Sequence, residues 1–504
     1  MVDTLLSAAS VFRTIGSVLL AILILLIMIT IHEFGHWVAG KILRFGINEF
    51  SIGFGPAIFK HKSKKSGQVF AIRLIPLGGY CSFQDEDGLE DEKKEKESLP
   101  ENKEETVGQS DKAEDGNISE SASADTVILT PAPEEEHKEV EAEPVEEPKE
   151  APAEEDFFAD LPAPAEEGKK GRKKKRTPAW KEKPDDGSFT SKAPWKRIIV
   201  LVAGALMNYI LALFLIIVCF FAYGQTMTAA YEAETSTQQF LEALHNNQMT
   251  KQDFLENDCL HDRDIFLKAN GKNLYMTVDL ARAVNGKKAG DRVELYLSRI
   301  VPDKTERDSE TGEIKIVESH REKVTVKITV CSDVEVNNSS ELDSAWKGLG
   351  IRYAETKDEE GNVTGGGYQL ASATAKFGFF ETLGRSFVYS FKIAGSILRV
   401  IGELLTGRLG ISAMGGPIST IKATSEMASL GFRYFLEISA LIGVNLAVFN
   451  LLPVPALDGC KVVCTVIEWI RGKPISRKVE AIIHAAGFVL LLGFAVLVDI
   501  LQFV

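Results

Sequence analysis

The chain has 504 residues, of which 45% are hydrophobic and 25% are charged, and its formal net charge is −14. That length is sufficient for several domains. The mean hydropathy near zero averages very apolar segments with a very polar one, so the composition excludes a single, uniformly soluble domain.

The first apolar segment, about residues 15–38, is long enough to span a bilayer, which takes about 20 apolar residues. Near its end stands the motif His32-Glu-Phe-Gly-His36. The H-E-x-x-H spacing puts two imidazoles on one helix face, one turn apart, where both can bind one zinc ion beside a carboxylate. Ionisable groups at membrane depth are costly and usually mark function. The alternative interpretation is a pair of polar residues at a frayed helix end.

Two short strands are predicted after this segment, at residues 50–56 and 70–80, and the second contains Gly78 and Gly79. A free backbone edge would be costly in lipid, so we expect the pair to lie within protein or at the membrane interface. Such an edge can also pair with an extended peptide.

Residues 85–190 form a polar insert that is acidic to about residue 167 and basic through residues 169–176. The insert lacks apolar periodicity, so we predict that it is disordered. The basic cluster could indicate nucleic-acid binding. Because it lies close before the second apolar segment, we expect a cytoplasmic patch that contacts anionic membrane lipid, and no nucleic acid.

Three further segments can span a bilayer, at about residues 198–221, 435–452 and 481–503. Residues 377–405 are amphipathic and carry charges, which favours an interfacial helix over a span. Positive charges gather between the first two spans and after the third, so both loops are predicted to be cytoplasmic. The N-terminus, residues 223–430 and the C-terminus would then lie on the opposite side.

The soluble segment at residues 225–335 mixes strands with short helices. Strands are predicted near residues 264–271, 290–299 and 323–330, and a short helix at residues 278–284. Its two cysteines, Cys259 and Cys331, could form a disulfide, although two separate thiols are the simpler expectation.

A catalytic zinc site usually has three protein ligands and water, so the two histidines leave one ligand missing. The best candidate is Asp458, directly after the third span. Pro453 and Pro455 break the helix there and can aim the side chain inward. The predicted topology puts Asp458 and both histidines in the cytoplasmic half of the membrane. The alternative ligands are His484 and Asp499 in the fourth span.

These residues indicate hydrolysis of a peptide bond. Bound zinc polarises a carbonyl and activates water, and Glu33 can take the proton from that water and pass it to the leaving amine. Glu33 could instead support a neighbouring ligand, but the ligand pair needs a base, and Glu33 is suitably placed.

In chain order, these motifs resemble those of the site-2 protease family (M50) of intramembrane zinc metalloproteases. They are most similar to its bacterial branch, which contains a PDZ domain and processes anti-sigma factors. The similarity extends over most of the chain outside the insert. The matching stretches are His32–His36, Gly53–Pro56, Pro76–Tyr80, Gly204–Asn208, Gly416–Ile418 and Asn450–Gly459.

The resemblance implies a Zn²⁺ ion held by His32, His36 and Asp458, with Glu33 as the base. It implies single-span membrane proteins as substrates, such as anti-sigma factors and remnant signal peptides, already trimmed by an upstream site-1-type protease. The positions that it implies for seating the substrate are Asn450, Pro453, Pro455, Gly78 and Gly79. One departure from the family pattern is Cys460, a weak rival ligand beside Asp458.

We therefore expect a multi-pass protein of the plasma membrane, with about four transmembrane helices, a membrane-associated β-hairpin and an extracytoplasmic α+β PDZ-like domain. Two other classes remain open: a catalytically inactive PDZ scaffold, and a zinc or proton transporter. The intact base and ligands argue against the scaffold, and the small number of spans argues against the transporter. The expected divisions are 1–84 (first span and hairpin), 85–190 (insert), 191–224 (second span), 225–335 (PDZ-like domain), 336–430 (linker with the interfacial helix) and 431–504 (third and fourth spans).

Overall fold

The computed structural model describes residues 2–64, 66–85, 186–233, 237–339, 341–357, 363–410 and 415–503. Nearly all of the insert predicted at residues 85–190 lies outside these residues, so its disorder and its lipid contact stay predictions.

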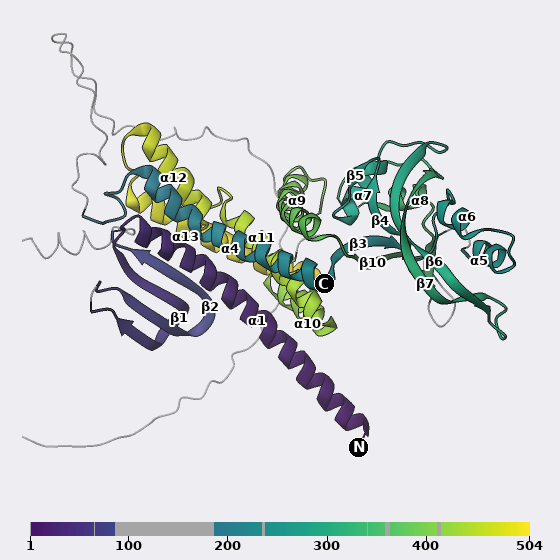
Figure 1. Cartoon of the computed structure of the whole chain (residues 1–504). Coiled ribbons are helices and arrows are strands. Elements are labelled where there is room, and N and C mark those ends of the chain that lie inside the picture. Colours follow the sequence, from purple (N-terminus) through teal and green to yellow (C-terminus); the bar gives the residue numbers. More distant parts are fainter. Residues whose placement is uncertain are drawn as a thin grey trace, which may run out of the picture. The chain divides into compact units, whose positions relative to one another are not determined.

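Among the described residues, four helices are long and apolar enough to cross a membrane, at the four places expected from the sequence. They are α1 (Val2–Ile42), α4 (Pro194–Tyr223), α11 (Phe432–Asn450) and α13 (Arg477–Phe503). Helix α4 packs against both α1 and α11 (Figure 1). A Cβ atom added to Gly35 would lie only 2.4 Å from the carbonyl oxygen of Ala203, so the glycine lets α1 and α4 approach closely.

Three shorter helices accompany these candidate spans. They are α9 (Phe379–Leu405), α10 (Pro417–Leu430) and α12 (Asp458–Arg471). Helix α9 exposes aromatic rings such as Phe380 (85% exposed) and buries Arg385 on another face, and it is not among the candidate spans. The stretch after the third span was expected to be a loop, but α12 begins there at Asp458.

The hairpin of β1 (Ile47–Lys62) and β2 (Val69–Phe83) is longer than the two short strands that were predicted. Residues 49–52 of β1 pair with residues 69–72 of β2 on one side and with residues 79–82 on the other. Residues 57–62 of β1 pair with the first of these β2 segments as well. The two strands therefore fold into four paired segments, and residues 79–82 lie at one edge. Figure 1 shows this sheet beside α1.

Positive backbone φ angles allow the two long strands to bend in this way. Gly53 and Gly55 have φ angles of 85° and 83°, and Gly78 has a φ angle of 129°. Residues with a Cβ atom rarely adopt such angles, so glycine is needed at these bends.

A second, antiparallel sheet forms an α+β domain. Its strands are β3 (Gln225–Ala230), β4 (Ile265–Ala269), β5 (Lys272–Asn273), β6 (Arg292–Arg307), β7 (Ile314–Thr329) and β10 (Leu370–Ala375). Its helices are α5 (Thr237–His245), α6 (Lys251–Glu256), α7 (Thr277–Val284) and α8 (Asp343–Gly348). The strand order is β10-β3-β4-β6-β7, and β5 pairs with β4. The predicted strands near 264–271, 290–299 and 323–330 and the helix at 278–284 are confirmed as β4, β6, β7 and α7. Strand β10 pairs with β3, so the sheet continues beyond residue 335. Cys259 and Cys331 carry thiols and form no disulfide. Strands β8 (Tyr353–Lys357) and β9 (Val363–Tyr368) pair with each other in a separate two-stranded sheet.

The core of this domain contains a fully buried ion pair among apolar side chains. Arg299 donates to Asp264 at 2.8 Å, and both side chains have no exposed surface. The same guanidinium donates to the carbonyls of Leu255 at 2.9 Å and Asn257 at 3.0 Å. Because a buried charge needs both an opposite charge and hydrogen bonds, this pair holds the segment before β4 against β6.

Candidate metal centre

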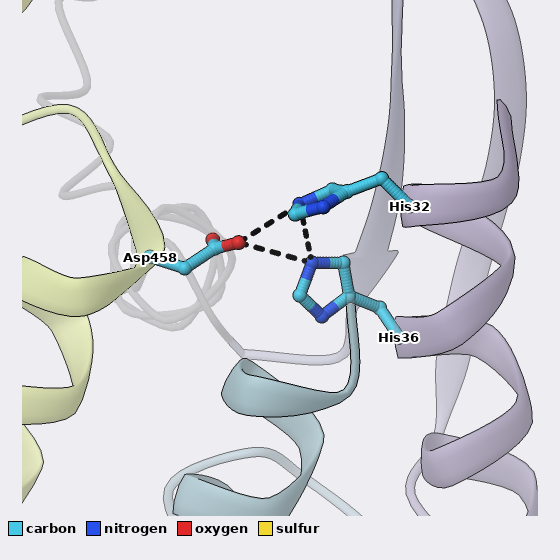
Figure 2. A group of neighbouring side chains, drawn as sticks. All are labelled: His32, His36 and Asp458. Atoms are coloured by element: carbon cyan, nitrogen blue, oxygen red, sulfur yellow. Dashed lines mark hydrogen bonds and ion pairs between the residues drawn. The ribbon is translucent and has the colours of Figure 1, made fainter. Parts of the chain in front are cut away.

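Three potential metal ligands converge from α1 and from the first residue of α12 (Figure 2). His32 Nε2 lies 2.9 Å from Asp458 Oδ2, His36 Nε2 lies 3.2 Å from the same oxygen, and the two Nε2 atoms are 3.1 Å apart. Both histidines are buried. Their spacing of four residues puts both rings on one helix face, as the motif predicted, with the ring planes at 81° to each other.

This donor set fits a zinc ion. Zinc binds imidazole nitrogen and carboxylate oxygen at about 2.0–2.2 Å in tetrahedral geometry, which separates neighbouring ligand atoms by about 3.3 Å. The three separations between His32, His36 and Asp458 are each within a few tenths of an ångström of that value. Two imidazoles and one carboxylate leave one tetrahedral position open, which is typical of catalytic zinc sites.

Polar groups on α4 and α11 orient both imidazole rings. His36 Nδ1 donates to the carbonyl oxygen of Val200 at 2.8 Å, which leaves Nε2 free to bind a metal. His32 Nδ1 lies 3.5 Å from the side-chain amide of Asn208 and 3.4 Å from that of Asn450. Ring orientation by such groups is a general feature of metal sites in proteins.

Asn208 is a site residue whose role the sequence motifs did not indicate. It is 1% exposed on α4. Its side-chain oxygen has no hydrogen-bond partner among the described residues, and turning the amide by 180° would let that oxygen accept from His32 Nδ1. The available signal was a buried amide inside a very apolar span, because polar groups there usually serve function.

Gly204 on α4 makes room for the two rings. A Cβ atom added to Gly204 would lie 2.3 Å from His36 Nε2 and 2.8 Å from His32 Cε1. The side of α4 that faces the histidines therefore tolerates no side chain at this position.

A cavity of about 300 Å³ opens beside the three ligands. Glu33 faces this cavity together with His36 and Asp458, so the predicted base and two of the predicted ligands share one space. Lys461, one helical turn after Asp458, also lines it. The remaining lining residues are Tyr80, Cys81, Ser82, Phe83 and Leu201.

The edge of the hairpin sheet forms one wall of the cavity. Residues 80–83 of β2 line it, and a Cβ atom on Gly79 would lie 3.3 Å from Glu33 Cγ. Arg73 donates to Glu49 at 2.6 Å, and the Tyr80 hydroxyl donates to the same carboxylate at 2.9 Å. This network ties the edge segment to the interior segments of the sheet.

The other residues considered from the sequence occupy different places. Pro453 and Pro455 lie in the turn between α11 and α12. His484 accepts a hydrogen bond from the backbone of that turn and is not in the ligand cluster. Asp499 accepts from the backbone N–H groups of Ile418 and Ser419, at 3.1 and 3.3 Å, and so caps α10.

Comparison with known proteins agrees with this geometry. The sequence model described as "Peptidase family M50" matches residues 20–494. The chain belongs to peptidase family M50. It is a zinc metalloprotease of the site-2 type, as the motifs indicated, and zinc is its metal.

Several relatives match this M50 protease over nearly its whole length. Zinc metalloprotease RasP of Bacillus licheniformis is 27% identical over 487 residues, which cover 95% of this chain and 96% of that protein. Regulator of sigma-W protease RasP of Bacillus subtilis is 25% identical over 488 residues, with the same coverage of 95% and 96%. Regulator of sigma E protease of Haemophilus influenzae is 39% identical over 121 residues, 24% of this chain and 27% of that protein.

Proposed function

We propose that this chain hydrolyses peptide bonds within the transmembrane segments of single-span membrane proteins. In this proposal His32, His36 and Asp458 hold the zinc ion and Glu33 is the general base. The observation that supports it most is the cluster of the three ligands, two of which line one cavity together with Glu33, beside a long apolar helix.

The chemistry follows from the residues around that cavity. Zinc, when bound, supplies Lewis acidity that polarises the scissile carbonyl and activates water. Glu33 directly follows His32 in α1 and faces the cavity, so it can take a proton from water and deliver it to the leaving amine. Asn208, Asn450 and the Val200 carbonyl hold the imidazoles in the orientation that this arrangement needs.

The edge of β2 is a suitable place for the substrate backbone. An unwound substrate segment can add as a strand to residues 79–82, because main-chain hydrogen bonds hold such a strand whatever its side chains. Gly79 has no side chain, so the substrate backbone can approach Glu33 closely. We also include Gly78, Asn450, Pro453 and Pro455 among the residues that seat the substrate.

The partners and the topology complete the proposal. The names of the relatives refer to regulation of sigma-W and sigma E, so anti-sigma factors are the first substrates to test. Remnant signal peptides are a second class, and an upstream site-1-type protease would trim the substrates first. We place the protein in the plasma membrane, with both termini and the α+β domain outside and the insert inside. In that position the α+β domain, which we interpret as PDZ-like, can act as a size filter.

The decisive experiment reconstitutes the full chain with a single-span substrate and compares the wild type with Glu33→Gln and Asp458→Ala. Glu33→Gln should retain zinc and lose cleavage, whereas Asp458→Ala should lose both. Cleavage by Glu33→Gln at the wild-type rate would rule out Glu33 as the base. An unchanged zinc content in Asp458→Ala would remove Asp458 from the ligand set. If the wild type itself cuts no transmembrane segment, the proposed substrate class is wrong.

A further inference from the structure

The turn that delivers Asp458 has an unusual backbone. Ala456, two residues before Asp458, has a φ angle of 77°, which lies in the left-handed region that residues other than glycine rarely adopt. Such a conformation persists only where the surrounding structure holds it. Contacts from outside the turn should therefore stabilise Ala456.

Helix α13 provides two contacts of this kind on consecutive residues of the turn. The backbone N–H of Ala456 donates to His484 Nδ1 at 3.1 Å. Pro455 packs against Gly487, where an added Cβ atom would lie only 2.2 Å from the Pro455 Cβ atom. His484 and Gly487 are three residues apart, so they share one face of α13.

The hydrogen bond is important because the turn has few of its own. Pro453 and Pro455 have no N–H group, and the remaining bonds within the turn are Val454 N–H to Leu452 and Leu457 N–H to Val454. The N–H of Ala456 points out of the turn and is satisfied by the imidazole of His484. Without that acceptor, a partly buried donor would lose its partner and the left-handed conformation would lose its restraint.

We propose that His484 is a positioning residue that holds Ala456 in its left-handed conformation and thereby sets the Asp458 carboxylate at the metal site. This inference rests on the proposed role of Asp458 as a zinc ligand. His484 acts through the turn backbone and needs no contact with zinc or substrate.

Two substitutions at His484 distinguish the loss of the hydrogen-bond acceptor from a change in side-chain size. His484→Leu removes the acceptor and keeps an apolar side chain, whereas His484→Asn places an amide oxygen close to the position of Nδ1. In the full chain in detergent, zinc affinity measured against a competing chelator should fall by about tenfold to 100-fold in His484→Leu, the range typical of groups that support a metal ligand. His484→Asn should stay within a few-fold of the wild type.

A second variant tests the backbone directly. Glycine adopts a φ angle of 77° without steric cost, so Ala456→Gly should restore much of the zinc affinity in the His484→Leu background. Ala456→Gly alone should have little effect. In metal-free protein, amide hydrogen exchange over residues 454–462 should be faster in His484→Leu and slower again in the double variant. A general packing defect would not be repaired by a glycine on another element.

The outcomes distinguish this inference from the proposed function. If Asp458→Ala loses zinc while His484→Leu keeps both the wild-type zinc affinity and the wild-type exchange, the positioning role is wrong. Equal losses in His484→Leu and His484→Asn, with no rescue by Ala456→Gly, would also overturn it. If Asp458→Ala itself keeps zinc, the proposed ligand set fails instead.

Discussion

Gly204 offers a sharp test of the metal centre, because one methyl group added there should prevent zinc binding. A Cβ atom at this position would lie 2.3 Å from His36 Nε2, whereas real Cβ contacts are essentially never below 3.0 Å. The His36 ring must therefore move by about 0.7 Å or more in Gly204→Ala, and His32 must move as well. Zinc–ligand distances in proteins vary by only about 0.2 Å, so the displacement exceeds what the site can tolerate.

We expect the zinc dissociation constant of Gly204→Ala to rise at least about 100-fold, which corresponds to about 2.7 kcal/mol. Cleavage of a reconstituted substrate should be lost with the metal. The substitution should not destabilise helix α4 itself, because alanine is favoured over glycine in a helix interior by about 0.5–1 kcal/mol. Zinc content after dialysis against a chelator and thermal unfolding of the metal-free protein measure the two effects separately.

Gly493→Ala in α13 is the matched control. It makes the same substitution inside a candidate span, at a position where an added Cβ atom would meet nothing within 4 Å. This variant should bind zinc and cut substrate as the wild type does. If Gly204→Ala also behaves as the wild type, α4 does not approach the histidines as closely as the structure indicates, and the geometric argument for the centre fails.

Three further predictions concern Asn208 and the α+β domain. Asn208→Leu should lower zinc affinity by about tenfold or more, because His32 loses an orienting partner; unchanged affinity in a chelator competition would contradict this. Burial lowers the pKa of His261 from 6.5 to about 3, so the unfolded chain binds a proton below pH 6.5 that the folded domain excludes. The free energy of unfolding of the α+β domain should therefore fall by about 2 kcal/mol between pH 7 and pH 5. Hydrogen exchange over residues 237–261 measures this change, and His261→Phe should abolish the pH dependence. Arg299→Met leaves Asp264 buried without its partner and should destabilise the domain by about 3–5 kcal/mol. In thermal unfolding, the Arg299→Met/Asp264→Leu double variant should recover most of that loss. A double variant as unstable as the single one would refute the explanation.

Local patterns were sufficient for much of the fold. The four candidate spans follow from runs of apolar residues, because crossing a bilayer depends on length and composition alone. Strands β4, β6 and β7 and helix α7 follow from periodicity within each segment. The shared face of His32 and His36 follows from the helical repeat. Each of these features depends on residues close together in the chain.

Pairings between segments far apart in the chain could not be predicted from the sequence. The predicted strands at residues 50–56 and 70–80 did not reveal that residues 49–52 pair on both sides, because register depends on partners rather than on local pattern. The pairing of β10 with β3 in the α+β domain was not predicted, for the same reason. The loop expected after the third span contains α12, which contacts α4.

The candidate centre shows the same difference between local features and contacts of distant segments. The sequence by itself named the two histidines and Glu33 as candidates, and it selected Asp458 because two prolines before it interrupt a helix. Only the tertiary structure shows which groups contact the rings, and that His484 accepts a hydrogen bond from the turn instead of joining the ligand cluster. The physical reason is that the two histidines and Glu33 lie within little more than one turn of α1. The supporting hydrogen bonds come from α4, α11 and α13, and only folding brings these helices to the site.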